Sequence, residues 1–541
     1  MSPVPPAVPG PRLGRRRTNC LSRSFRRRTN CLSRSFLLML MLAVFCWSPW
    51  RLLAAPPPNI VFILADDLGY GDLRCLNPDG KIATPQLDRL AAAGMTFTDA
   101  HSSSSVCTPT RYGLLTGRYN WRSRLQRGVL TGYSPRLIEE GRLTVAGFLQ
   151  QQGYATACVG KWHLGMDWPL RGEGTAQDEG NHARIDYEAE IRQGPNAVGF
   201  DHYFGISASL DMPPYIYLEN GRTLGVPTVR KKWLREGPAH VDFEAIDVLP
   251  RLGEEAVKFI DRQAAGGTAG KPFFLYLPLT APHTPILPPQ EWQGRSGLNP
   301  YGDFVMQVDA VVGQLLEALG RHQLAHDTLV IFASDNGCSP MAGLAELQAQ
   351  GHAPSCHFRG HKADLFEGGH RVPFLARWPA RIKPGTRSTQ LVCLNDLLAT
   401  CAEILGVTLP ADAGEDSVSL LPALEQRDDT PLREALVHHS GNGSFAIRQG
   451  PWKLCLCPDS GGWSQPRPGS PAARDLPPVQ LYNLDDDIGE TRNLQAEHPE
   501  IVRKLTALLD QYVAQGRSTP GPRPPNTVPV DLGRRRVVPS R

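Results

Sequence analysis

The segment that decides the fold of this chain is Asn59-Ile60-Val61-Phe62-Ile63-Leu64-Ala65, which is followed directly by Asp66 and Asp67. An apolar run of this length, rich in β-branched residues, is typical of a parallel strand that helices cover on both faces. The run ends abruptly in two carboxylates, which do not belong in an apolar core. We therefore expect the first strand of an α/β domain, with polar groups gathered at the carboxyl end of its sheet.

Further strands and helices alternate along the chain. Helical patterns cover 84–94, 143–153, 243–265 and 304–322, and strand-like runs cover 154–160, 273–279 and 329–334. This alternation predicts an α/β fold with a large, mostly parallel sheet sandwiched by helices. Polar residues follow the runs: Lys161 with His163, then His283, then Asp335 with Asn336. Four strand ends are therefore expected to converge on one site.

The character of the sequence changes near residue 426. Short strand-like runs at 446–448, 452–456 and 479–482 surround a Pro/Gly/Ser-rich loop at 458–478, and an amphipathic helix follows at 499–515. We predict four parts: a leader (1–55), a large α/β domain (56–425), a smaller α+β domain with an antiparallel sheet (426–515), and a disordered tail (516–541).

The charge of the chain is unevenly distributed. Ten of the 57 basic residues lie within residues 1–51, which hold no acidic residue. The 53 acidic residues therefore outnumber the 47 basic ones in the rest of the chain. A body of this charge gives no reason to expect nucleic-acid binding.

The N-terminus has the features of an export signal. An Arg-rich stretch precedes the apolar run 37–47, and Ala54-Ala55 offers small residues for cleavage. The run is too short for a stable membrane span, so we expect an exported protein, periplasmic or secreted, with an uncleaved anchor as the alternative. The 11 residues 15–25 recur as 26–36, which indicates a recent duplication or a start placed too far upstream.

Nine of the twelve cysteines lie beyond the leader. An odd number in an exported chain leaves at least one outside intramolecular disulfides, and Cys107 is our candidate.

The strongest motif is Cys107-Thr108-Pro109-Thr110-Arg111, followed by 112–118 (Tyr-Gly-Leu-Leu-Thr-Gly-Arg). Pro109 suits the first turn of a helix, which would place residue 107 near a helix N-terminus, where anions are favoured. The motif resembles the signature of the arylsulfatase A-type, formylglycine-dependent sulfatases of the alkaline phosphatase superfamily. The resemblance extends from about residue 57 to residue 515 and includes C-terminal motifs at 447–454 and 481–494. It implies that a formylglycine-generating enzyme oxidises Cys107 to formylglycine.

The chemistry implied by this resemblance is coherent. A hydrated formylglycine carries two hydroxyls on one carbon, so one can attack sulfur while the other later loses a proton and expels sulfate. A serine in that place would leave a sulfate ester that water must attack. Without the other motifs, Cys107 would be read as a buried or disulfide-bonded cysteine.

Four oxygen-bearing residues indicate a metal site: Asp66, Asp67, Asp335 and Asn336. Adjacent carboxylates repel each other unless a cation lies between them, and three carboxylates with an amide suit a hard ion such as Ca²⁺, with Mg²⁺ as the alternative. The family's Ala-Asp-Asp-x-Gly and Ser-Asp-Asn-Gly patterns match at 65–69 and 334–337, and the resemblance adds residue 107 to the ligands of one ion. Each motif alone could be an ordinary turn.

The resemblance also assigns groups that handle the sulfate. Arg111 would pair with the nucleophile and the sulfate, and Lys161 and Lys362 would bind sulfate oxygens. His163 would deprotonate the hydroxyl that drives elimination. His283 and Lys362 would bind the bridging oxygen and protonate the leaving alcohol. Ser209 is a further sulfate contact, with Ser207 as the alternative.

The expected activity is therefore hydrolysis of sulfate esters, of sulfated carbohydrates and of aryl sulfates. Residues near the motifs favour a sugar-binding rim, since Arg, His and Trp stack on sugars and bind sulfate: Trp121, Arg122, Arg124, His352, His357, Arg359, His361 and His370. Two alternatives stay open: a phosphoester or phosphonate hydrolase of the same superfamily, and a non-catalytic carbohydrate-binding homologue.

Overall fold

The computed structural model describes residues 56–178, 180–266, 270–427, 429–524 and 526–532. Contacts divide the chain into two units, Met1–Pro56 and Pro57–Arg541, and the second contains all the helices and strands of the described residues. The expected leader lies outside the described residues, as do residues 533–541 of the expected tail. Within the described ranges, no helix combines the length and hydropathy needed to cross a bilayer.

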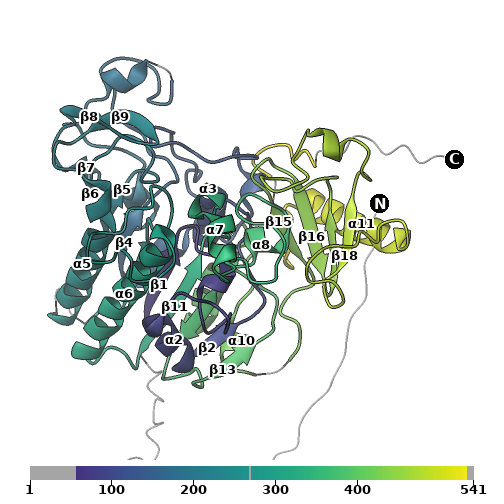
Figure 1. The fold of residues 1–541 in the computed structure, drawn as a ribbon. Helices are drawn as coiled ribbons and strands as arrows, with labels where there is room; N and C mark the ends of the chain where they lie inside the picture. The colour runs from purple at the N-terminus through teal and green to yellow at the C-terminus, as the bar shows by residue number, and fades with distance from the viewer. Residues whose placement is uncertain (1–55, 179, 267–269, 428, 525, 533–541) are drawn as a thin grey trace, which may run out of the picture. The chain divides into compact units, whose positions relative to one another are not determined.

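A ten-stranded, mostly parallel sheet organises this unit, as the sequence predicts (Figure 1). β1 (Asn59–Ala65) lies in its middle and pairs in parallel with β11 (Thr328–Ser334) and β10 (Phe273–Pro278), and β10 pairs in parallel with β4 (Ala155–Lys161). The strands follow the order β13 (Thr386–Ser388), β2 (Met95–Phe97), β12 (Phe374–Arg377), β11 (Thr328–Ser334), β1, β10 (Phe273–Pro278), β4 (Ala155–Lys161), β5 (His202–Ile206), β6 (Leu218–Glu219) and β7 (Arg222–Thr223).

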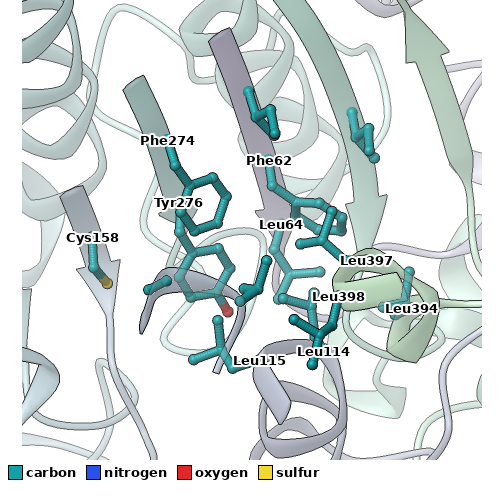
Figure 2. Close-up of a cluster of buried hydrophobic side chains, with 14 of the residues drawn as sticks. Phe62, Leu64, Leu114, Leu115, Cys158, Phe274, Tyr276, Leu394, Leu397 and Leu398 are labelled. Carbon is teal, nitrogen blue, oxygen red and sulfur yellow. The ribbon is translucent and has the colours of Figure 1, made fainter. Parts of the chain in front are cut away.

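Helices pack on both faces of the sheet because both faces of its central strands are apolar. Alternate residues of β1 enter different cores: Val61 and Ile63 join one cluster with residues of α2, α5 and α6, whereas Phe62 and Leu64 join the other. Figure 2 shows the second cluster, in which Phe62 and Leu64 face Leu114 and Leu115 of α3 and Leu397 and Leu398 of α9. The helices are α2 (Pro85–Ala92), α3 (Cys107–Thr116), α4 (Val145–Gln151), α5 (Ala245–Ala264), α6 (Pro300–Arg321), α7 (Leu344–Ala349), α8 (Glu367–His370), α9 (Leu397–Leu405), α10 (Leu421–Leu424) and α11 (Pro499–Gln515).

The predicted elements are present with small shifts at their ends. The largest shift is in α6, which begins at Pro300 rather than at Phe304. The Asn299 side chain accepts hydrogen bonds from the first backbone N–H groups, and Pro300 occupies the first helical position, so this helix has a strong local start signal upstream of its apolar pattern. Several strands were not predicted. They are β13, β2, β12, β5, β6 and β7 of the large sheet, β15 (Leu436–His439), and two short pairs, β3 (Ala100–His101) with β14 (Val392–Cys393) and β8 (Val229–Trp233) with β9 (Arg235–Ala239).

A separate four-stranded antiparallel sheet follows in the chain, made of β15 (Leu436–His439), β16 (Phe445–Gln449), β17 (Trp452–Cys455) and β18 (Gln480–Asn483). One face packs against α11, since Leu505 and Leu509 of that helix share a core with Ile447 and Leu454. The predicted antiparallel sheet with its terminal helix is therefore present. The proposed domain boundary at residue 426 stays a prediction.

The first part of the expected disordered tail lies against the body of the protein instead. The N–H of Ser518 donates to Asp416, and the guanidinium of Arg122 donates to Asn526 (3.0 Å). Arg122 and Asp416 are buried charges that need partners, and the polar groups of this segment supply them. The composition of a segment does not show that buried charged residues far away in the chain will bind its polar groups.

Candidate active site

The predicted site residues meet at the carboxyl edge of the central strands. Asp66 and Asp67 follow β1, Asp335 and Asn336 follow β11, His283 follows β10, and Lys161 ends β4. These four strands are neighbours in the order β11, β1, β10, β4, so their ends converge as predicted. Together with residues from α3 and two loops they form the active-site cluster: Asp66, Asp67, Cys107, Arg111, Lys161, His163, His283, Asp335, Asn336 and Lys362.

Cys107 is the first residue of α3 and is buried. Its sulfur and the nearest carboxylate oxygens of Asp66 and Asp335 all lie within 4.8 Å of one another. Arg111, one turn further along α3, donates to Asp335 (2.7 Å) and lies 3.7 Å from Asp66. The helix N-terminus and the guanidinium therefore make the surroundings of residue 107 favourable for an anion.

Two lysines neutralise the first pair of carboxylates. The Lys161 ammonium lies 2.7 Å from Asp66, and the Lys362 ammonium lies 2.6 Å from Asp67. His283 faces Asp67 with its Nε2 at 3.7 Å. Burial opposes the charge of Lys362, but the adjacent Asp67 carboxylate outweighs this and raises the pKa of the ammonium. Lys362 is thus held as a charged group inside the protein.

The oxygens of this cluster fit a hard divalent cation. Asp66, Asp67, Asp335 and Asn336 are all buried, and Asn336 is joined to Asp67 through its amide nitrogen (2.8 Å). Within the described part of the chain, one oxygen of Asp66 and the amide oxygen of Asn336 have no hydrogen-bond partner. Buried oxygens without donors are costly, and ligation of a cation would satisfy them.

The carboxylates also perturb each other. Burial and the nearby Asp66 carboxylate raise the pKa of Asp335 to about 7. Burial also opposes ionisation of Asp66, but Lys161 and the other cations around it hold the pKa of that carboxyl below its usual range. A bound cation would remove the repulsion that disfavours ionisation of Asp335.

His163 is held in one tautomer by the backbone. Its Nε2 lies 2.8 Å from the carbonyl oxygen of Leu130, which can only accept, so the proton resides on Nε2. Nδ1 is then an acceptor, and it is buried without a partner in the described residues. Burial and the neighbouring Lys161 hold the pKa of the ring well below its ordinary value. His163 is therefore a neutral imidazole with a free lone pair on Nδ1.

The two serines differ in their relation to this histidine. The backbone N–H of His163 donates to the carbonyl of Ser207 (3.0 Å), so Ser207 lies beside it. The carbonyl of Ser209 instead accepts from Met212 in a turn. Both hydroxyls are buried without partners among the described residues. This placement favours Ser207, and the assignment of Ser209 as a sulfate contact stays a prediction.

Lys362 reaches the site from a loop that two segments hold. Its N–H donates to the carbonyl of Cys338, just after Asn336, and the N–H of Ala363 donates to the carbonyl of Ser105, just before Cys107. The loop is thereby tied to the strand end and to the helix start that carry the other site residues. The sequence motif predicted that Lys362 belongs to the site, but only the fold shows how its loop is bound to the other site segments.

Half of the residues expected at a sugar-binding rim do not reach the surface. Four of its residues are buried and have structural partners: Trp121, Arg122, His352 and His370. Arg122 forms a bidentate pair with Asp416 (2.9 Å for each bond), His352 bonds to Asp72, and His370 lies against His101 and His438. Arg124 and His357 remain exposed, and His361 and Arg359 are half-buried. Residue type alone does not reveal which side of a loop faces solvent.

The number of cysteines does not single out Cys107, contrary to the expectation from the sequence. All nine cysteines of the described residues are free, so an unpaired thiol does not distinguish this one. Burial raises the pKa of the Cys107 thiol although Lys161 and Lys362 oppose this. An unmodified Cys107 is accordingly a protonated thiol rather than an activated thiolate.

The sheet, its layers and the cluster at its carboxyl edge define an alkaline phosphatase-like hydrolase fold with an anion-binding centre. The family model described as Sulfatase matches residues 58–407. The chain is 35% identical to N-acetylgalactosamine-6-O-sulfatase of Bacteroides thetaiotaomicron, over 84% of this chain and 92% of that protein. It is 34% identical to human arylsulfatase A, over 86% of this chain and 91% of the relative.

A solved structure from a study of glycosaminoglycan metabolism by Bacteroides thetaiotaomicron superposes with a TM-score of 0.72. It is 31% identical in sequence and covers 84% of this chain and 99% of its own. The chain therefore belongs to the sulfatase family, and it is an enzyme of that family, a sulfatase.

Proposed function

We propose that this sulfatase hydrolyses sulfate esters of carbohydrates, and aryl sulfates as well, through a formylglycine made from Cys107 and one bound Ca²⁺. The observation that carries the proposal is the position of Cys107 at the start of α3, within 4.8 Å of the Asp66 and Asp335 carboxylates. The names of the relatives support the substrate class, since one is an N-acetylgalactosamine-6-O-sulfatase and another is an arylsulfatase.

Asp66, Asp67, Asp335 and Asn336, with residue 107, would hold the cation. When bound, Ca²⁺ would lower the pKa of a hydroxyl on residue 107 and offset negative charge on a sulfate oxygen. The two orphaned oxygens, on Asp66 and Asn336, support this ligand set. Mg²⁺ would use the same oxygens, but it demands a stricter octahedral geometry.

The protein's own side chains would then bind the sulfate and move the protons. Arg111, Lys161 and Lys362 place three cationic groups around residue 107 and would hold the sulfate oxygens by charge-assisted hydrogen bonds. His163 would accept a proton at Nδ1, the ring nitrogen that has no other partner among the described residues.

His283 would act at the leaving oxygen. Its Nδ1 lies 2.6 Å from the carbonyl oxygen of Thr284, so Nδ1 carries a proton and Nε2 faces the cluster. After taking up a proton at Nε2, the ring would pass that proton to the departing alkoxide, release an alcohol and return to its neutral form with the proton on Nδ1. Sugar substrates need this transfer most, because their hydroxyls are poor leaving groups.

Export and maturation complete the proposal. A signal at residues 1–55 would direct the chain to the periplasm or the exterior, and a formylglycine-generating enzyme would act before or during that passage. The start of α3 is buried in the folded protein, so the modifying enzyme would need the segment before it folds.

Mass spectrometry of natively produced protein tests the maturation step. The peptide that contains Cys107 is expected as the aldehyde or its hydrate, whereas the peptide of buried Cys158 is expected as a thiol and serves as the control. An intact thiol at position 107 in active enzyme would refute the formylglycine mechanism.

Paired kinetics separate the alternatives. We expect 4-nitrophenyl sulfate to be hydrolysed with a higher kcat/KM than 4-nitrophenyl phosphate or a phosphonate monoester. A large preference for a phosphorus ester would favour the phosphoester or phosphonate hydrolase. Absence of all hydrolysis by protein that carries formylglycine would favour the non-catalytic homologue.

A further inference from the structure

One large aromatic side chain on the surface is unexplained by the proposed chemistry. Trp463 is 45% exposed and lies in the Pro/Gly/Ser-rich loop at 458–478. A Trp at the surface presents a wide apolar face that usually stays covered. The position of this loop relative to the active-site cluster therefore matters.

The backbone around Trp463 is bound to the loop that carries Lys362. The N–H groups of Trp463 and Ser464 both donate to one oxygen of Asp364, at 2.7 and 3.0 Å, and the Ser464 hydroxyl bonds to its other oxygen. Asp364 is only two residues from Lys362, whose ammonium lies against Asp67. A single buried carboxylate thus joins Trp463 to the sulfate-binding side of the site.

Two further contacts fix the same short segment. The N–H of Leu365 donates to the carbonyl of Ser460 (2.8 Å). Gly462 lies so close to Ala363 that a Cβ on it would be 2.3 Å from the Ala363 carbonyl oxygen. Residues 460–464 therefore follow residues 363–365 along their length, and the close approach requires glycine.

The base of the loop is also pinned. The side-chain amide of buried Gln480 donates to the carbonyls of Cys457 and Asp459, each at 2.9 Å. A loop held at its base and along one side pre-organises the residue at its exposed turn, which lowers the entropy lost when a ligand binds there. The ordered loop thus holds an exposed aromatic residue in a fixed position, as expected of a residue that binds a ligand.

His361 adds a polar group on the other side of the same carboxylate. Its N–H donates to Asp364 (2.9 Å), so the backbones of His361 and Trp463 flank one side chain. Its Nδ1 lies 3.1 Å from the carbonyl oxygen of Lys362, which leaves Nε2 as an acceptor. Pyranose rings expose C–H faces and hydroxyl edges, so sites that bind them combine an apolar ring with hydrogen-bonding groups.

We propose that Trp463 is a sugar-stacking residue that binds a carbohydrate unit of the substrate next to the unit that bears the scissile sulfate. This inference rests on the proposed function and deepens it: the preferred substrate is a sulfated oligosaccharide rather than a monosaccharide or a small aryl sulfate. Trp463 contributes to binding of the sugar chain and takes no part in sulfate transfer.

The test compares the Trp463→Ala enzyme with the wild type on two kinds of probe. The first is 4-nitrophenyl sulfate, which has no second sugar. The second is a panel of hexasaccharide pools prepared from chondroitin sulfate, heparan sulfate and carrageenan, titrated against each protein by calorimetry. Leu476→Ala is the matched control, because Leu476 lies in the same loop and is 41% exposed.

Trp463→Ala is expected to weaken binding of the best hexasaccharide about tenfold, which corresponds to loss of one aromatic contact. Trp463→Phe is expected to restore part of the affinity, and Leu476→Ala to leave it unchanged. Hydrolysis of 4-nitrophenyl sulfate is expected to be the same in all four proteins.

Equal hexasaccharide binding by wild type and Trp463→Ala would overturn the proposal, as would failure of the wild type to bind any pool. Loss of a wild-type dimer in Trp463→Ala, with sugar binding unchanged, would assign the ring to a contact between protein chains. Failure of the proposed function has a different signature, since the wild type would then not hydrolyse 4-nitrophenyl sulfate.

Discussion

Two clusters of charged and histidine side chains are buried in this enzyme, and they are built differently. The active-site cluster contains oxygens and a ring nitrogen that have no partner among the described residues. The second, here called the sheet-joining cluster, links the large sheet region to the four-stranded sheet. It consists of Asp99, His101, Glu367, His370, His438, Arg448, Lys453 and Glu490.

The sheet-joining cluster satisfies most of its own charges. Lys453 contacts Glu367 (2.9 Å) and Glu490 (2.8 Å), and Arg448 binds both oxygens of Asp99, at 2.7 and 2.8 Å. His101, His370 and His438 also resemble a metal site by proximity. The rings of His370 and His438 are stacked at 3.7 Å and 17°, however, so one ion cannot lie in both ring planes.

The comparison shows that proximity of acids and histidines does not by itself identify a functional site. In the sheet-joining cluster the charges neutralise each other and join two layers of structure. Both clusters contain atoms without a hydrogen-bond partner among the described residues, but their kinds differ: in the sheet-joining cluster they include the two ring nitrogens of His438, whereas in the active-site cluster they include carboxylate and amide oxygens that suit a cation. Removal of the cation, and substitutions in each cluster, test this difference.

Removal of the cation should have the largest effect. Treatment with a chelator followed by desalting is expected to lower kcat on 4-nitrophenyl sulfate by about 10³-fold or more, because the cation supplies several kcal/mol of charge stabilisation. Added Ca²⁺ is expected to restore activity and raise the melting temperature, since it binds only the folded state. Full activity after verified removal of metal, by elemental analysis, would exclude the metal site.

Lys453→Met should damage stability rather than chemistry. The substitution leaves Glu367 and Glu490 buried without their ammonium partner, which is expected to cost about 3–5 kcal/mol of unfolding free energy. Urea unfolding measures this, with Lys258→Met as control, because the surface pair of Lys258 and Glu255 is worth about 1 kcal/mol or less. A Lys453→Met enzyme as stable as the control would contradict the structural role.

His163→Gln should show the opposite pattern. The expected loss in kcat is about 10²–10⁴-fold, because Gln offers no base at the position of Nδ1. The melting temperature should change little, since His163 makes one side-chain hydrogen bond, to Leu130, that an amide N–H can replace. If the variant loses melting temperature as well as kcat, His163 has a structural role rather than a catalytic one.

The smallest expected effect is the change of stability with pH that arises from His438. Burial, and then the charges of His101 and Lys453, hold the pKa of His438 well below its ordinary value. Glu367 acts in the opposite direction, and Arg448 adds to the lowering. The folded state thus resists a proton that the unfolded state accepts. The free energy of unfolding is therefore not reduced by this group above about pH 6.5. Below that pH it falls by about 1.4 kcal/mol per pH unit for one such group.

Melting temperatures measured from pH 7.5 to pH 5 should therefore fall less steeply in His438→Leu than in the wild type. Exposed His326 serves as the control position, because His326→Leu removes a histidine from outside both clusters. Identical slopes for wild type and His438→Leu would show that the ring is not excluded from protonation.

Much of the fold and of the candidate site could be predicted from short stretches of sequence. The apolar run at 59–65 predicted the central strand, because hydrophobicity and β-branching are properties of a few consecutive residues. The motif around Cys107 predicted the start of α3, and the polar residues after each strand predicted the site, because parallel strands align their carboxyl ends.

Other features depended on residues that are far apart in the chain. The tautomer of His163 is set by the carbonyl of Leu130, and a backbone carbonyl leaves no trace in the sequence. The burial of Trp121 and Arg122, the free state of all nine described cysteines and the attachment of residues 516–524 and 526–532 likewise follow from packing. Each requires knowledge of which distant group supplies a partner or excludes water.

The sequence by itself thus determined the class of fold, and it predicted a nucleophile position and the groups that would bind metal and sulfate. The tertiary structure decided which of those groups are satisfied by one another and which remain available to a ligand. The physical reason is that residue type determines what a side chain can donate or accept, whereas burial and distance determine what it actually meets.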